Sequence, residues 1–203
     1  MHMKTEHHQP GDLLRRGRVL EWMTLGWNVV GVGVLAVLAL TASSAALAGF
    51  GADSFIEIGA SAVVLWELSG TGEERQRRAL RFIGVAFVLL ATVLSVQSTV
   101  ALLTCHHATP GLGGIAWTGI TALVMFALAV AKSRTGRALG NPVLVSEGRV
   151  TFVDGLLAVA VLLGISFDLF LGWWWADPVA GYVIVVYATR EAVQLLRTSK
   201  GHG

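Results

Sequence analysis

Hydrophobic residues gather into six long segments that are separated by short polar or basic stretches. The segments cover residues 23–40, 54–68, 82–103, 114–131, 151–170 and 178–192. About 20 apolar residues are needed for a helix to cross a bilayer, so each segment predicts one membrane-spanning helix once flanking residues are included. The second segment reaches that length only if it begins near Leu47, which leaves residues 41–44 as the first turn.

The composition agrees with this pattern. Of 203 residues, 54% are hydrophobic and 14% are charged, and the mean hydropathy is +0.67, which is typical of a multi-span membrane protein. We therefore expect an all-α protein, a six-helix transmembrane bundle that forms one domain. The predicted division is a cytoplasmic tail over residues 1–21, a membrane domain over 22–196, and a short cytoplasmic tail over 197–203.

The positions of the basic residues predict the orientation of the bundle. All 15 Lys and Arg fall in the N-terminal tail, in the connections at 73–81 and 132–149, or after residue 189. Under the positive-inside rule, both termini and these two connections lie in the cytoplasm. The first 21 residues also lack the apolar core of a secretory signal. We expect an integral protein of the plasma membrane, and we attribute the sequence pI near 9.0 to this orientation and not to nucleic-acid binding.

Carboxylates inside the apolar segments are the candidate chemistry. Asp53 and Glu57 are four residues apart and so share one helix face, and Asp154 lies early in the fifth segment. An ionised side chain near the bilayer centre costs at least about 2.5 kcal/mol, so acidic residues there call for an explanation. Glu147 lies two turns before Asp154, at the predicted cytoplasmic mouth, where it either attracts cations or faces water.

Three carboxylates from two helices make an oxygen-rich site that suits a divalent cation, with Ser54, Asn28 and Glu147 as further candidate ligands. The alternative is that the carboxylates share protons or bond to polar groups of neighbouring helices. No Lys or Arg is expected at membrane depth to neutralise them, which favours a cation or proton site. No nucleophile and base pair, zinc-protease motif or phosphate loop is evident, so we expect no enzyme and no cofactor.

These motifs resemble those of the cation diffusion facilitator family. Its second membrane helix carries D-x-x-x-D, which Asp53 and Glu57 match with Glu in second place, and its fifth carries H-x-x-x-D, which Asp154 matches while Val150 replaces the His. The family's start of the sixth helix is matched by the run Trp-Ala-Asp-Pro at 175–178, in which we expect Asp177 to be the N-cap. The resemblance covers roughly residues 22–196 and implies export of a divalent metal in exchange for protons.

Two departures from the family pattern affect these expectations. Without the histidine, three carboxylates form a harder site, which makes manganese and iron the alternatives or weakens zinc binding. Zinc is the first expectation, because the resemblance implies it and carboxylates can bind it. The sequence also ends soon after the sixth segment, so we expect only the transmembrane domain and, if there is a homodimer, contact through membrane helices, the third above all. A degenerate family member that senses metal or modulates a partner without transport is the alternative function.

Soft metal ligands occur outside the apolar segments as well. His2, His7 and His8 lie in one tail and His202 in the other, while Cys105, His106 and His107 form a predicted outer loop. The tail histidines either collect metal or are simply solvated. The loop either receives exported zinc, forms an intersubunit site or is an ordinary exposed loop. A single cysteine allows no internal disulfide.

Overall fold

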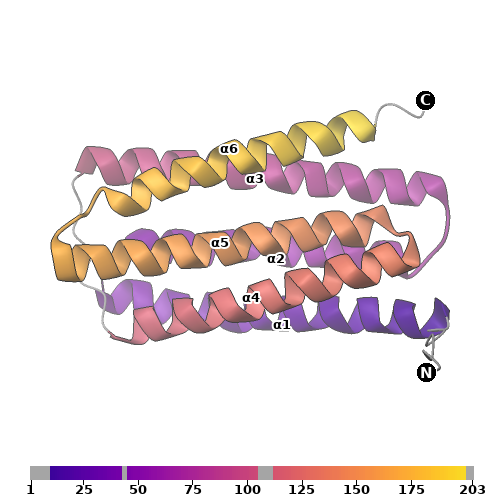
Figure 1. Cartoon of the computed structure of the whole chain (residues 1–203), viewed down its shortest axis with the longest axis horizontal. Coiled ribbons are helices and arrows are strands. Elements are labelled where there is room, and N and C mark those ends of the chain that lie inside the picture. The colour runs from indigo at the N-terminus through magenta and orange to yellow at the C-terminus, as the bar shows by residue number, and fades with distance from the viewer. Residues whose placement is uncertain (1–9, 43–44, 105–111, 200–203) are drawn as a thin grey trace, which may run out of the picture.

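The structure is a computed structural model that describes residues 10–42, 45–104 and 112–199. These residues form six α-helices and no strand, which confirms the all-α prediction (Figure 1). The helices are α1 (Pro10–Ala42), α2 (Ala45–Leu68), α3 (Glu73–Thr104), α4 (Leu112–Leu139), α5 (Pro142–Leu171) and α6 (Ala176–Thr198).

Consecutive helices run in opposite directions along one long bundle (Figure 1). The start of α1 and the end of α6 lie at the same end, together with the α2–α3 and α4–α5 connections. The helices pack most extensively as the pairs α1 with α2, α3 with α6, and α4 with α5. Because α5 also contacts α2, α3 and α6, it is the helix around which the interior is built.

Four helices of the described chain are long and apolar enough to cross a membrane, over Gly11–Leu38, Glu73–Thr104, Leu112–Leu139 and Pro142–Phe167. Large apolar side chains cover the outside of the bundle, among them Leu40, Leu103 and Leu123. Exposed apolar surface of this extent is stable in lipid and not in water. The buried residues of the interior include both an apolar core and a set of polar side chains.

The connection between α4 and α5 is built by local backbone chemistry. Gly140 has φ of 63°, a conformation that suits glycine after a helix end, and the Asn141 N–H donates to the Gly136 carbonyl at 2.9 Å. Asn141 then caps α5, because its Oδ1 accepts hydrogen bonds from the N–H groups of Val143 at 2.9 Å and Leu144 at 3.1 Å. Pro142 follows at the first helical position, where no N–H is needed.

The observed helices extend beyond the predicted apolar segments at the end of the bundle where α1 begins. Residues 10–21, predicted as tail, form the first turns of α1, and α4 continues to Leu139 while α5 begins at Pro142. Basic and polar residues such as Arg and Gln are good helix formers, so a helix does not have to stop where its apolar pattern stops. This extension brings charged residues of α1, α4 and α5 into the bundle.

The start of α6 differs from the prediction. The N-cap position is occupied by Trp175, without a side-chain capping hydrogen bond, and the helix begins at Ala176. Asp177 is therefore the second helical residue, and its prediction as the N-cap is wrong. Pro178 is tolerated because the first turn of a helix has no intrahelical partners for its N–H groups.

Glycines allow α4 and α5 to approach closely. A Cβ added to Gly148 would lie 2.7 Å from the Ser133 Oγ and 3.2 Å from the Ala129 carbonyl oxygen. One added to Gly136 would lie 2.9 Å from the backbone nitrogen of Val145. Such contacts between small residues replace the hydrophobic effect as the source of helix association in lipid.

Candidate functional site

A column of buried polar side chains runs through the middle of the bundle between α1, α2, α4 and α5. Each member is at most 5% exposed. Its charged members are Glu21, Asp53, Glu57, Lys132, Glu147 and Asp154, and its uncharged members include Asn28, Ser54, Ser61 and Thr151. Charged groups are almost never fully buried without a partner, so the contacts within the column decide what it can do.

Helical spacing places these side chains on inward faces. On α5, Glu147, Thr151 and Asp154 follow one another at four and three residues, so they line a single face over two turns, about 10 Å. On α2, Asp53, Glu57 and Ser61 are spaced by four. The helices α2 and α5 run in opposite directions (Figure 1). Asp53 interacts with Asp154, and Ser61, two turns further along α2, donates to Glu147, two turns nearer the start of α5.

Asp154 is the least satisfied group of the column. It is 2% exposed, and neither of its carboxylate oxygens accepts a hydrogen bond from any donor among the described residues. The carboxyl group of Asp53, which is 3% exposed, lies close enough to share a proton with it. Two carboxylates buried in contact are stable only if a proton or a cation lies between them.

Glu57 lies one turn along α2 from Asp53 and is 2% exposed. Its Oε1 accepts a hydrogen bond from the Thr151 hydroxyl at 2.5 Å, whereas its Oε2 has no hydrogen-bond partner among the described residues. Asp53, Asp154 and Glu147 all interact electrostatically with this carboxylate. The three predicted ligands on α2 and α5 are thus neighbours, each with unused oxygens or a contact to another acid.

Lys132 changes the interpretation of the charge balance. Its ammonium group is fully buried, and its Nζ lies 2.5 Å from Glu147, 3.1 Å from the Glu21 Oε2 and 3.1 Å from the Thr151 Oγ1. The expectation that no Lys or Arg reaches the acidic residues is therefore wrong, because α4 continues past the apolar segment that predicted its end. An ammonium group has three hydrogens, and these three acceptors use all of them.

The predicted ligands do not all lie where the sequence suggested. Glu147 is fully buried and pairs with Lys132, so the alternative that it faces water is wrong. Ser54 and Asn28 are buried, and each donates to a backbone carbonyl of its own helix, Phe50 at 3.3 Å and Thr24 at 3.1 Å. Val150, which stands in the place of the family's histidine, is buried in the apolar core.

Within the described part of the chain, no three His, Cys, Asp or Glu side chains are arranged so that they could hold a metal ion together as they lie. Metal binding by the carboxylates of α2 and α5 would therefore require side-chain rotation or a shift of the two helices. Such a shift is ordinary for a site that has to open to each side in turn. The assignment of Asp53, Glu57 and Asp154 as metal ligands stays a prediction.

Several predicted metal-binding residues lie outside the described residues. They are the tail histidines His2, His7, His8 and His202, and the loop residues Cys105, His106 and His107. Their predictions are unchanged.

Sequence reasoning missed four members of the column, which are Glu21, Ser61, Lys132 and Thr151. A signal for one of them, Lys132, was present in Asn141-Pro142, a strong helix start nine residues before the predicted one. That start puts α4 and α5 side by side over additional turns, and these turns carry Lys132 and Glu147. For Glu21, its spacing with Gly17, Thr24 and Asn28 indicates one inward helix face.

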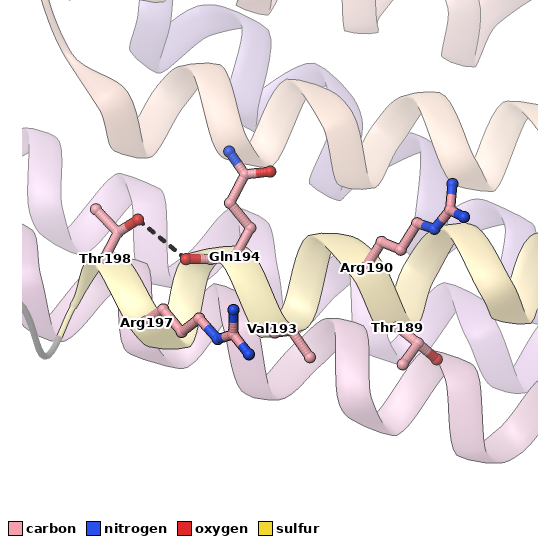
Figure 2. A pocket seen from close by; sticks show the side chains of 6 residues that line it. All are labelled: Thr189, Arg190, Val193, Gln194, Arg197 and Thr198. Carbon is pink, nitrogen blue, oxygen red and sulfur yellow. Dashed lines mark hydrogen bonds between the residues drawn. The ribbon is translucent and has the colours of Figure 1, made fainter.

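A shallow groove on the outer surface is separate from the column. Figure 2 shows it on the last turns of α6, lined by Thr189, Arg190, Val193, Gln194, Arg197 and Thr198. The Thr198 hydroxyl donates to the Gln194 carbonyl at 2.9 Å within the same helix. All the lining residues lie on one helix and none is acidic, so the groove offers no carboxylate to a metal cation.

Four helices suited to membrane crossing and an apolar exterior define an integral membrane protein. One relative is "Transmembrane protein 163" of Xenopus laevis, which is 23% identical over 200 residues that make up 93% of this chain and 69% of the relative. No family model matches the chain. The similarity to a transmembrane protein agrees with the class, and the resemblance to the cation diffusion facilitator family stays a prediction.

Proposed function

We propose that this protein is a secondary transporter that exports a divalent metal cation from the cytoplasm in exchange for protons. Zinc is the first candidate, and manganese and iron are the alternatives. The observation that carries the proposal is Asp154, whose two buried oxygens lack donors although the facing Asp53 is also acidic. Native interiors rarely leave buried carboxylate oxygens without a donor, and a cation or proton that binds in the functional cycle accounts for this site.

Proton exchange follows from the same groups. A metal ion binds deprotonated carboxylates, so its entry between Asp53, Glu57 and Asp154 releases the protons that hold these groups together without metal. When the site then opens to the other side and the metal leaves, protons from that side take its place. All three ligands are oxygen donors, which suit manganese and iron as well as zinc.

The distribution of basic residues supports an orientation for this transport. The described arginines lie on the halves of the helices nearest the start of α1, as Arg15, Arg78, Arg137 and Arg197 illustrate. Under the positive-inside rule, that end faces the cytoplasm, all six helices cross the membrane, and both termini are cytoplasmic. The plasma membrane is the proposed location, and a homodimer through membrane helices is the proposed assembly.

A regulatory protein that binds metal without moving it is the second candidate. The ion pairs of Lys132 with Glu21 and Glu147 favour this second candidate, because they hold α1, α4 and α5 together and so oppose the helix movements that transport needs. The two candidates differ in flux, since a sensor binds metal in detergent but does not fill a sealed vesicle.

Asp154→Asn tests the proposal in proteoliposomes supplied with zinc, manganese, iron or cobalt. We expect wild type to accumulate at least one of these metals, and the variant to lose at least about tenfold of that flux, since an amide retains the shape but not the charge. Asp12→Asn, on the exposed first turn of α1, is the matched control and should transport normally. Equal flux in wild type and Asp154→Asn would contradict the assignment.

A further inference from the structure

Lys132 lies between the candidate metal site and one end of the bundle. Along α5, its partner Glu147 is two turns nearer the helix start than Asp154, and along α2, Ser61 is two turns nearer the helix end than Asp53. The Ser61 hydroxyl donates to the Glu147 Oε1 at 3.2 Å, so α2 closes the same layer. Residues of α1, α2, α4 and α5 therefore meet around one ammonium group.

The Lys132 side chain is fully buried in this layer. Its exposed fraction is 0%, as are those of Glu21, Glu147, Ser61 and Thr151. A cation moving from that end of the bundle toward Asp53 and Asp154 would have to pass the place where the ammonium group lies. It would also be repelled by a positive charge held there in a low-dielectric interior.

Thr151 connects this layer to the candidate metal site. Its hydroxyl has one hydrogen, with Glu57 Oε1 at 2.5 Å and Glu147 Oε1 at 3.3 Å as possible acceptors, and its oxygen accepts from Lys132 at 3.1 Å. A cation bound by Glu57 would compete with this hydrogen bond. The hydroxyl would then turn to Glu147, where it competes with the ammonium group for the same oxygen.

We propose that Lys132, held by Glu21, Glu147 and Thr151, is a tethered cation that closes the route between Asp53, Glu57 and Asp154 and the end of the bundle where α1 begins. The Thr151 hydroxyl links its position to the occupancy of Glu57. The role of this gate in transport rests on the proposed function, but the closure itself is a property of the metal-free protein. It can be measured without any metal.

Cysteine accessibility tests the closure in the full chain. In a Cys105→Ser background, Ser54→Cys places a thiol beside Asp53, beyond the Lys132 layer. Sealed vesicles are treated from outside with a charged methanethiosulfonate reagent, and a separate Asp12→Cys variant identifies vesicles in which the start of α1 faces outward. From that side, we expect Lys132→Ala to speed modification of residue 54 at least about tenfold. From the opposite side, the rate should not change.

Arg134→Ala is the matched control, since this arginine is exposed and lies two residues further along the same helix. It should leave the modification rate unchanged. Because Lys132→Ala leaves buried glutamates without their partner and so risks misfolding, Glu21→Gln and Thr151→Val provide milder tests. Glu21→Gln removes the charge of one partner of the ammonium group and Thr151→Val removes one acceptor, so each should speed modification by about threefold or more.

Rates within twofold of the background for all folded variants would overturn the gate. If Asp154→Asn loses metal flux while the modification rates stay unchanged, the transport proposal holds and the Lys132 gate is rejected. Faster modification in the variants of a protein that carries no metal flux would support the gate and contradict transport.

Discussion

At the scale of single residues, the buried acids of the candidate site were predictable and their counter-ion was not. Asp53, Glu57 and Asp154 were found because a carboxylate in an apolar run is costly wherever the helix ends lie. Lys132 was assigned to a connection because it begins a basic stretch, and only the structure places it inside the bundle. A charged residue at the edge of an apolar segment faces either water or a partner, and the partner comes from another helix.

Val150 is the position where one substitution should change metal preference. It lies one turn before Asp154 on α5, so a histidine there would bring an imidazole nitrogen to the site. We expect Val150→His to increase the ratio of zinc to manganese flux by about tenfold, since nitrogen donors favour zinc. The measurement is competition between the two metals in proteoliposomes.

Val153→His is the control for this change, because Val153 is also buried on α5 but lies off the line through Asp154. The histidine at this position adds the same imidazole away from the candidate metal site, so it should lower stability and leave the ratio of zinc to manganese flux unchanged. An equal ratio in wild type and Val150→His would place the transported ion elsewhere.

At the scale of helices, the apolar pattern predicted the number of elements well and their ends poorly. Lipid requires every backbone group to be satisfied within the helix, which makes each long apolar segment a helix. The ends depend on local chemistry instead, such as Asn141 and Pro142 at the start of α5. Close helix packing could not be predicted either. In sequence, Gly148, which contacts α4, cannot be distinguished from Gly33, which has no atom within 4 Å of an added Cβ.

Gly148→Ala should destabilise the bundle by about 1–3 kcal/mol, since its methyl group would overlap Ser133 on α4. Gly33→Ala changes the same atoms on the exposed side of α1, where no atom lies within 4 Å. There we expect no loss and up to about 1 kcal/mol of gain from helix propensity. Thermal unfolding in detergent compares the two, and equal melting temperatures would contradict the observed packing of α4 on α5.

At the scale of the whole molecule, six antiparallel helices enclose one polar column in an apolar exterior. The column has two layers, the acids Asp53 and Asp154 and the ion pair of Lys132 with Glu21 and Glu147. The order of residues along the chain does not predict this arrangement, because each layer joins side chains from helices far apart in sequence. A metal moving past both layers would exchange for protons at the first and displace an ammonium group at the second.

The exchange of metal for protons can be recorded in a single measurement, with lumenal metal and lumenal pH followed together in proteoliposomes whose α1-start end faces outward. We expect metal to enter as protons leave, so the lumen becomes more alkaline. Uptake should rise as the external pH rises, because deprotonated carboxylates bind the metal. Both signals should disappear together in Asp154→Asn. Metal uptake without a pH change, or both signals persisting in Asp154→Asn, would contradict exchange at the buried carboxylates.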